Sequence, residues 1–404
     1  MAPVVTSCER SRAAQWVSAR GSMPSLAAQR EAADAIFEEA IRIHDWRKAI
    51  LVRKFAWSLK RKRNRHTRAP EDVTTWDALK YSEAFLFSRE DVAQLLRLLG
   101  LPATVTTDSM DKSTTEYALC VLLHRLTKGV EWSVTVSLLG SSQARLSRLA
   151  SHLLSLLFPI AQRKLRGFVG NETREELQAF KNLILEKVLA NNASHNTETG
   201  WNSDVCALID GTDVKISRPS ATQWKGLNVQ REYYTGHKKA HTVKFQAVVA
   251  PTGLCLDFFG PVAGSHNDGY VWHKSELARR LERTGQENED HFLLAGDPAY
   301  FSYESVYTGF RRSAHQDLDE SQAQFNTALS RVRLPVEWFF GDLKVKYFRF
   351  FEKKNFFKLG ETAFTHYSFV GVFLLNCFYC LRGTNEACSY FHSKPPTLEE
   401  YLSN

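Results

Sequence analysis

Apolar residues recur at two different spacings along this chain, and the change between them separates a helical part from a mixed part. Between residues 76 and 166 they recur at the three- and four-residue spacing of amphipathic helices. Ser88 has the character of a helix cap, and Gly100 ends the apolar pattern that follows it. Further helices are predicted over residues 115–126, 132–138 and 141–157.

Short apolar runs separated by turn residues replace the helical spacing after about residue 204. A turn at residues 251–253 joins two of these runs, so the pair is predicted to be a hairpin. A helix predicted over residues 270–281 lets the last run lie parallel to the first. The pattern therefore predicts an α/β fold with a mixed sheet flanked by helices. The predicted strands span residues 205–212, 241–249, 254–259 and 291–296.

These patterns divide the chain into regions of different character. A polar stretch at residues 190–200 follows a predicted helix over 172–189 and marks a boundary. The predicted regions are a basic, partly helical N-terminal region (1–75), an all-α region (76–166), a helix and polar linker (167–204), an α/β domain (205–385) and a C-terminal tail (386–404).

Composition and charge narrow the class of protein. A formal net charge of +8 and a sequence pI of about 9.0 favour an anionic partner, nucleic acid first and an acidic membrane surface second. The seven cysteines are scattered and odd in number, which favours a reduced, intracellular chain. The longest apolar run, residues 368–381, is shorter than the roughly 18 residues of a membrane-spanning helix. We therefore expect a soluble protein without a membrane partner.

A basic run lies near the end of the N-terminal region. Two functional interpretations are a nuclear localisation signal and a phosphate-binding arm, and a solvated linker is the alternative. The run contains Lys60, Arg61, Lys62 and Arg63.

The predicted helices up to residue 157 have the order helix, short helix, tight turn, helix. This order fits a helix-turn-helix unit, and a helical bundle with an exposed polar face is the alternative. In a helix-turn-helix unit the start of the last helix would offer polar side chains to a DNA groove. Those side chains are Ser142, Gln143, Arg145 and Arg148.

Three carboxylates stand where the predicted elements could bring them together. Asp210 and Asp297 each end an apolar strand, and Glu337 lies at the border of the apolar stripe of a later helix. Pro335 predicts that this helix starts or kinks there. Three carboxylates at one sheet edge suit two divalent metal ions and phosphodiester chemistry. The apolar stripe beside Glu337 comprises Val332, Val336, Phe339, Phe340 and Leu343.

Four motifs in a fixed order, spread over about residues 205–385, resemble the DDE endonuclease domain of Harbinger-type (PIF/Harbinger) transposases and their domesticated nuclease relatives. The helical region upstream resembles the helix-turn-helix region that precedes this domain in the family. The motifs are Tyr234–Val249, Gly264–Asp268, Gly296–Tyr300 and Glu337–Lys344.

The resemblance implies an RNase H-like fold with a metal-dependent nuclease site. The family's catalytic metal ligands fall on Asp210, Asp297 and Glu337, and Asp268 matches a further acidic position of supporting role. Oxygen ligands favour Mg²⁺ or Mn²⁺ as the cofactor. Two departures from the family pattern are the additional acid Asp213 and the Pro335 inside a segment that is usually helical.

The resulting prediction is a nuclear, metal-dependent DNA endonuclease or transposase that cuts or joins DNA at element ends. The alternatives are a domesticated DNA-binding protein without transposition and a nuclease that acts on RNA. Family members often work with a separate Myb-like DNA-binding protein, so the resemblance implies such a partner as an option. A homo-oligomer is a further option. The cations expected to hold the DNA backbone are Lys238, Lys239, Arg311 and Arg312.

Two other patterns have competing interpretations. The set Cys377, Cys380, Cys388 and His392 resembles a zinc site, but its first cysteines lie in an apolar helix, which favours buried thiols. The aromatic tract over residues 347–357 either stacks on bases or packs under the sheet.

Overall fold

The chain separates into two compact units, residues 1–67 and 68–404. The computed structural model describes only parts of the second unit. The predicted N-terminal helix and the basic run Lys60–Arg63 lie outside the described residues, so the nuclear localisation stays a prediction. The described ranges are 69–168, 172–193, 201–220, 223–224, 227–288, 290–300, 305–312, 317–353, 357–359 and 363–403.

The all-α region has the predicted helices and a small hairpin that was not predicted. Ser88 accepts a hydrogen bond from the Asp91 backbone and Asp91 accepts one from Ser88, forming the capping box of α5. Gly129 takes a left-handed conformation and ends α6. The elements are η1 (Val73–Thr75), α4 (Ala78–Phe85), α5 (Arg89–Leu98), β1 (Thr104–Thr106), β2 (Lys112–Thr114), α6 (Thr115–Lys128), α7 (Trp132–Leu139), α8 (Gln143–Leu165) and α9 (Arg174–Ala193).

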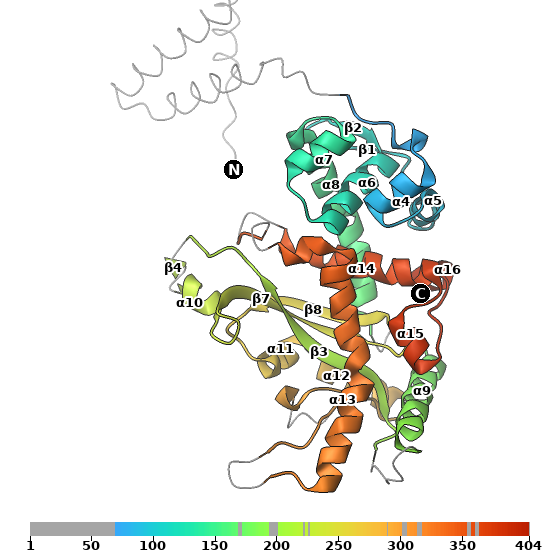
Figure 1. The fold of residues 1–404 in the computed structure, drawn as a ribbon, viewed down its shortest axis with the longest axis vertical. Coiled ribbons are helices and arrows are strands. Elements are labelled where there is room, and N and C mark those ends of the chain that lie inside the picture. Colours follow the sequence, from blue (N-terminus) through green and yellow to red (C-terminus); the bar gives the residue numbers. More distant parts are fainter. Residues whose placement is uncertain are drawn as a thin grey trace, which may run out of the picture. The chain divides into compact units, whose positions relative to one another are not determined.

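The second part is a mixed sheet flanked by helices, as predicted (Figure 1). Its main strands lie in the order β10-β9-β3-β7-β8, in which β3 pairs antiparallel with β7 and parallel with β9. This order and these directions are RNase H-like. The strands are β3 (Val205–Lys215), β7 (Ala240–Val249), β8 (Cys255–Ala263), β9 (Leu293–Ala295) and β10 (Val306–Tyr307).

Between β3 and β7 the chain forms a short excursion that ends on the edge of the sheet. It comprises β4 (Gln223–Trp224), β5 (Leu227–Asn228), α10 (Val229–Tyr233) and β6 (Tyr234–Thr235), which pairs with the start of β7. The helix predicted over 270–281 is divided at Glu276, where the backbone has a φ of 56°. The two resulting helices are α11 (Asp268–Ser275) and α12 (Leu277–Asn288).

The side chains of β3 alternate between the two faces of the sheet, and different helices cover each face. The face of Asp210 and Thr212 meets the long helix α13 (Glu320–Gly341), whereas the face of Gly211 meets the start of α11. In Figure 1 α13 crosses in front of the sheet. After α13 come η3 (Asp342–Tyr347, π-helical), η4 (Arg349–Glu352), α14 (Phe364–Arg382), α15 (Glu386–Phe391) and α16 (Leu398–Ser403).

Pro335 lies inside α13, so of the two predicted alternatives, a helix start and a kink, the start is wrong. A proline cannot donate to the carbonyl four residues before it, which leaves the Arg331 carbonyl without its helical partner. The hydroxyl of Tyr390 donates to that carbonyl over 3.2 Å. The neighbouring helix α15 therefore satisfies the group that the proline leaves free.

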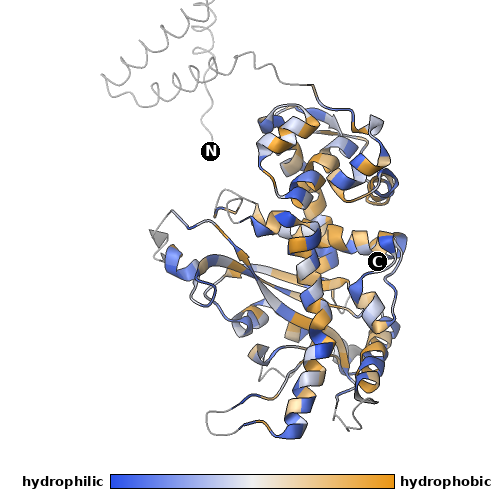
Figure 2. Ribbon diagram, viewed as in Figure 1, coloured by the Kyte–Doolittle hydropathy of each residue, from blue (hydrophilic) through white to orange (hydrophobic). Residues whose placement is uncertain are grey.

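Helix α14 is mainly hydrophobic (Figure 2), and most of its residues are buried. It is 19 residues long, so by length and composition it could cross a membrane, and the expectation that its apolar run is too short was wrong. Within the described residues, however, 83% of its apolar window is buried inside the protein. Its Asn376 is also buried and hydrogen-bonds the backbone of Cys255 on β8 through both amide atoms. The residues predicted as a tail include α16, which packs against α14.

The all-α region shares a core with the sheet domain. The C-terminal half of α8 packs along α14, and the Arg125 guanidinium of α6 lies 5.3 Å from the centre of the Phe350 ring. A Cβ atom at Gly129 would lie 2.7 Å from the Arg349 carbonyl oxygen. The aromatic tract contributes buried rings to this core, so of its two interpretations the packing one is confirmed. Those rings are Phe348, Phe350, Phe351 and Phe357.

The buried side chain of His124 links α6 to α7, and its lowered pKa leads us to predict that stability depends on pH. Its Nδ1 lies 3.2 Å from the Thr135 hydroxyl in a buried site. Burial, followed by the charges of Lys128 and Arg125, lowers the pKa of His124 from 6.5 to about 4. Below about pH 6.5 the His124 side chain becomes protonated in the unfolded chain but stays neutral in the folded protein. The free energy of unfolding therefore decreases as pH falls from 6.5 toward 4.

We expect the wild-type free energy of unfolding to fall by about 2 kcal/mol more than that of His124→Gln between about pH 7.5 and pH 5. Urea unfolding of both proteins at the two pH values measures this difference. Equal losses in both proteins would show that His124 is not the group responsible.

Candidate active site

Asp210 lies inside β3 and not at its end, which corrects the prediction. Strand β7 pairs with β3 from Leu208 to Lys215, so β3 continues for several residues beyond Asp210. Strand β9 stops at Ala295, which pairs with Leu208, and the chain reaches Asp297 two residues later. The two aspartates are therefore brought to neighbouring positions, as predicted, although only the strand before Asp297 ends there.

The turn after β9 fixes Asp297. Its carboxylate accepts a hydrogen bond from the Ala299 backbone over 2.8 Å, and its carbonyl accepts one from Tyr300. The Tyr300 ring is fully buried under this turn, and its hydroxyl lies 3.5 Å from the Gln246 side-chain oxygen. Burial, then the charges of Asp268, Asp210 and Asp297, raises the pKa of Tyr300. The Tyr300 side chain is therefore a neutral phenol close to Asp210, Asp268 and Asp297.

Asp210 is the acid most strongly perturbed by its surroundings. Its side chain is 21% exposed, and its Oδ2 lies 3.5 Å from Nη2 of Arg333 on α13. Burial, together with repulsion from Asp297 and Asp268, raises the pKa of Asp210 from 3.8 to about 6 against the attraction of Arg333. Burial is thus the main reason that Asp210 holds its proton more tightly than an exposed aspartate does.

Asp268 approaches β3 from the other face of the sheet. A Cβ atom at position 211 would lie 2.5 Å from an Asp268 oxygen, so Gly211 leaves the space that this carboxylate occupies. The same oxygen accepts a hydrogen bond from the Lys244 ammonium over 2.9 Å. Asp268 is thus held by β7 beside the pair of aspartates, and its predicted metal contact stays a prediction.

Glu337 lies one helical turn after Arg333, on the side of α13 that is directed toward Asp210. The predicted apolar stripe beside it is buried, which confirms how this helix is anchored. Farther on, the Lys344 ammonium donates to the Thr212 hydroxyl and to the Asp213 carbonyl. Glu337 itself is exposed and forms no hydrogen bond or ion pair within the described part of the chain.

The carboxylates of Asp210, Asp297 and Glu337 are suitable ligands for a hard divalent cation. Their present arrangement does not bring all three close enough to bind one ion. Within the ranges that the structure describes, no group of three or more His, Cys, Asp or Glu side chains is arranged to hold a metal ion. Carboxylate oxygens are nevertheless the donors that Mg²⁺ and Mn²⁺ take. Burial is the main cause of the raised pKa of Asp210, and a bound cation would favour its charged form.

The helix-turn-helix candidates are partly engaged inside the protein. Arg148 forms an ion pair with Asp111 over 2.5 Å, and Arg145 donates to the Lys112 carbonyl over 2.6 Å. These contacts tie the β1–β2 hairpin to the start of α8. Gln143 is exposed, and Ser142 caps α8 by accepting from the Arg145 backbone. DNA binding through these residues stays a prediction, and the two arginines would have to share or leave their present partners.

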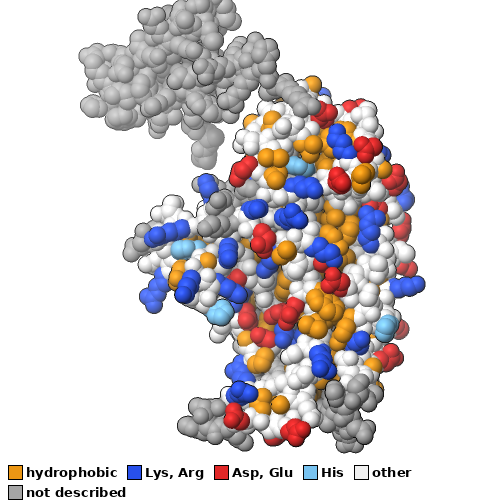
Figure 3. Space-filling model, viewed as in Figure 1, with side chains coloured by type: hydrophobic (Ala, Val, Ile, Leu, Met, Phe, Trp, Pro, Cys, Tyr) orange, Lys and Arg blue, Asp and Glu red, His pale blue; other side chains and the backbone are white. Residues whose placement is uncertain are grey.

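The other predicted DNA-binding cations lie on two exposed loops. Lys238 and Lys239 occupy the turn between β6 and β7, and the charge of Lys238 reaches Lys344 beside β3. Arg311 and Arg312 follow β10, which is parallel to β9, so they leave the sheet at the same edge as Asp297. Figure 3 shows acidic side chains in the middle of one face with lysines and arginines around them.

The zinc-like set is not a metal site in this structure. Cys377, Cys380 and Cys388 are buried free thiols, and Cys388 contacts the Thr252 carbonyl. His392 has a left-handed backbone conformation and ends α15. No metal-holding group occurs among the described residues, which favours the interpretation as core thiols.

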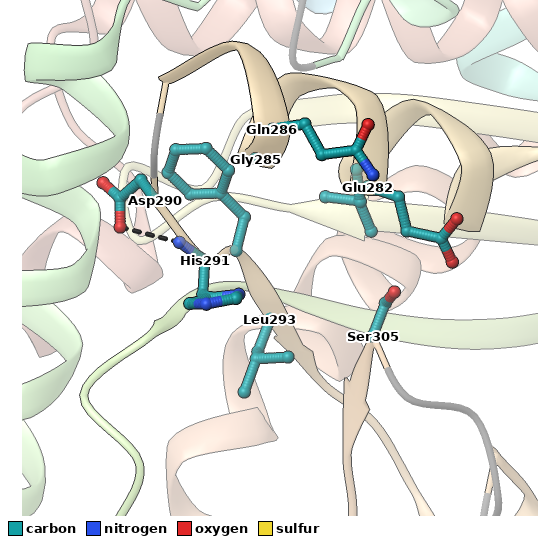
Figure 4. A pocket seen from close by; sticks show the side chains of 9 residues that line it. Glu282, Gly285, Gln286, Asp290, His291, Leu293 and Ser305 are labelled. Atoms are coloured by element: carbon teal, nitrogen blue, oxygen red, sulfur yellow. Dashed lines mark hydrogen bonds between the residues drawn. The ribbon is translucent and has the colours of Figure 1, made fainter.

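A cavity of about 440 Å³ is lined by none of the candidate metal ligands Asp210, Asp297 and Glu337. It is bordered by α12 and by the beginning of β9, with Asp290 and His291 at one side, whereas Asp297 follows the other end of β9 (Figure 4). The candidate site is therefore an open sheet edge and not this cavity.

Sequence reasoning missed the cations that hold the acids. Arg333 lies outside the four motifs, whereas Lys244 lies inside the first of them, Tyr234–Val249, and was not assigned a role. Arg333 lies four residues before Glu337 on the same helix face, and Lys244 lies on the strand paired with β3. The resemblance had included Tyr300 and Lys344 in its motifs without assigning them a role.

Comparison with known proteins agrees with this geometry. No curated protein and no solved structure matches the chain significantly. A family of catalytic domains does match, and its match begins one residue before Asp210 and extends past Glu337 into α14. Residues 209–371 of this chain match the DDE superfamily endonuclease family, which suggests a nuclease of transposase type.

Proposed function

We propose that this chain is a metal-dependent DNA endonuclease of Harbinger type, which hydrolyses or transfers phosphodiester bonds at transposon ends. The observation that carries the proposal is the proximity of Asp210 on β3 to Asp297, which directly follows the parallel strand β9. Helix α13, which carries Glu337, packs against β3. The family match over residues 209–371 supports the same reaction and DNA as the substrate.

Each residue has a role that follows from its position. Asp210, Asp297 and Glu337 would hold Mg²⁺ or Mn²⁺, and Asp268 would support Asp210 from the other face of β3. When bound, divalent cations activate the attacking oxygen and stabilise the departing one. The Asp297 turn keeps its carboxylate oriented through the Ala299 amide, and the Tyr300 ring is buried beside that turn. A Myb-like partner, a homo-oligomer and nuclear location remain part of the proposal.

Nicking of supercoiled DNA tests the proposal most directly. We expect wild-type protein to nick in Mn²⁺ or Mg²⁺ and not in EDTA, and Glu337→Gln to lose at least about 100-fold of that rate. Glu337 is exposed and unpaired in the described part of the chain, so its replacement should leave the melting temperature unchanged. Equal nicking by both proteins would reject Glu337 as a catalytic residue.

A second prediction concerns the turn between β6 and β7. Replacing Lys238 and Lys239 by Ala should weaken DNA binding and lower the slope of log K against log salt by about two, because each phosphate contact releases counterions. Fluorescence anisotropy over a salt series measures both quantities. The matched control replaces exposed Lys394 and Arg279, which lie outside the turn between β6 and β7, and should leave the slope nearly unchanged.

A DNA-binding protein without catalysis is the second candidate, and a specific observation favours it. Asp210 is paired with Arg333 and Glu337 contacts neither aspartate, so the three ligands are not assembled in the described residues. This candidate predicts salt-dependent DNA binding in both proteins and metal-dependent nicking in neither.

A further inference from the structure

Two arginines at the start of α8 meet partners of different charge. Nη2 of Arg145 lies 2.6 Å from the Lys112 carbonyl oxygen, and its Nη1 lies 3.2 Å from the Ser141 hydroxyl. Both of these groups are neutral, so they leave the positive charge of Arg145 in place. Nε of Arg148 instead lies 2.5 Å from Oδ2 of Asp111, whose carboxylate cancels the charge of that arginine.

The turn of the β1–β2 hairpin holds Asp111 in position for this ion pair. The Asp111 backbone donates to the Thr107 hydroxyl over 3.2 Å, and its carbonyl accepts from the Thr107 backbone over 3.0 Å. The Asp111 side chain is 17% exposed, against 39% for Arg148. The hydrogen bond from Arg148 is the main cause that lowers the pKa of Asp111, and the charge of Arg145 contributes least. Asp111 is therefore a partner of Arg148 far more than of Arg145.

The difference between the two arginines matters for binding to DNA. Affinity for DNA of arbitrary sequence comes mainly from protein cations that replace counterions at the phosphates. A guanidinium that is already paired with a carboxylate releases few counterions, and the carboxylate itself repels the phosphate backbone. The hairpin thus places an acid where it opposes binding to any phosphate beside Arg148.

We propose that Asp111 is a specificity-determining residue of DNA binding, which withholds Arg148 from the phosphate backbone and so lowers the affinity of the chain for duplexes of unrelated sequence. Arg145, whose partners are neutral, supplies a backbone contact. This inference rests on the proposed function, because it takes DNA as the partner and the start of α8 as part of the interface. Weaker non-specific binding raises the ratio of specific to non-specific affinity, which decides how well a site is found among competing DNA.

Fluorescence anisotropy with a duplex of arbitrary sequence in EDTA tests the inference. Asp111→Asn should bind about 5-fold more tightly and steepen the slope of log K against log salt by about one, because Arg148 gains a phosphate contact. Asparagine can still accept from the Thr107 hydroxyl, so the turn is kept. Arg148→Gln alone should change the affinity less than about twofold, and in the Asp111→Asn background it should return the affinity to the wild-type value.

Two matched variants separate this effect from a general change in charge. Asp108→Asn removes the same charge from an exposed position of the same hairpin, and it should change the affinity less than about twofold. Arg145→Gln removes the same charge as Arg148→Gln from the same helix, and it should weaken binding about 5-fold. Circular dichroism establishes that each variant folds. If Asp111→Asn does not fold, the two arginine variants carry the test, and equal effects from both overturn the inference.

Failure of this inference and failure of the proposed function give different results. If the wild-type protein binds no DNA duplex, the proposed function and the inference are both overturned. If the wild type nicks DNA in Mn²⁺ but Asp111→Asn binds the duplex no more tightly than wild type does, only the role of Asp111 is overturned. Equal gains from Asp108→Asn and Asp111→Asn also overturn that role, because net charge alone would then explain them.

Discussion

The Asp210→Asn variant is expected to nick DNA at least about 1000-fold more slowly than wild type, because it loses about 4 kcal/mol of metal-supported stabilisation of the transition state. Asparagine keeps the shape of the side chain and removes the charge that holds the cation. Nicking of supercoiled DNA in Mn²⁺ measures the loss, with the EDTA reaction as background.

The same substitution is expected to make the metal-free protein more stable. Burial raises the pKa of Asp210 from 3.8 to about 6, so folding favours the neutral side chain. The stabilisation from the neutral Asp210 side chain is fully present below pH 3.8. It is lost as pH rises through about 6, where the Asp210 carboxylate becomes charged in the folded protein. Removing the charge should therefore raise the free energy of unfolding at about pH 7.5 by about 1–3 kcal/mol.

Urea unfolding in EDTA measures this second effect. Loss of nicking together with a gain in stability would identify Asp210 as a residue kept for function at a cost to folding. Loss of both would instead attribute the missing activity to misfolding. Asp213→Asn is the matched control on the same strand, since the Asp213 carboxylate accepts from the Thr242 hydroxyl and is not a proposed ligand. That control should keep nearly all of the nicking rate.

The Asp257→Ala variant is expected to lose about 3–5 kcal/mol of stability, the largest structural effect that we predict. Asp257 lies on β8 with a side chain that is 1% exposed. Its carboxylate pairs with Arg166 over 3.1 Å and with Arg280 over 2.7 Å, and Arg280 also donates to the Arg166 carbonyl. Removing the acid leaves two guanidinium groups facing each other without their shared counterion.

Urea unfolding at neutral pH measures the loss, and two neighbouring arginines provide the matched comparison. Arg280→Ala removes a partner of the buried Asp257 and should also destabilise strongly. Arg279→Ala removes an exposed arginine whose pair with Glu276 lies in solvent, and it should cost less than about 0.5 kcal/mol. If Arg280→Ala and Arg279→Ala reduced the free energy of unfolding equally, the buried ion pairs of Asp257 would contribute no more to stability than a pair in solvent.

Local chemistry explains which parts of the fold could be predicted from the sequence. The Ser88 cap and the stop at Gly129 depend on residues adjacent in the chain, so α5 and α6 appear where expected. The strands around Asp210 and Asp297 were found from apolar runs with turn residues between them. The prediction missed the left-handed backbone at Glu276, which divides the expected helix. The expected helix start at Pro335 was wrong as well, since α13 continues through the proline and Tyr390 of α15 bonds the carbonyl that it leaves free.

The sequence by itself determined the order of elements, the mixed α/β class and the acidic residues that resemble a DDE site, because periodicity and motif order are properties of the chain. Only the tertiary structure decided which cation meets which acid. Asp210 pairs with Arg333, 123 residues later (333 − 210), and Asp268 pairs with Lys244 across a strand and a turn. Such pairs depend on the register of β3 against β7 and on the packing of α13 over the sheet, and no local spacing encodes either.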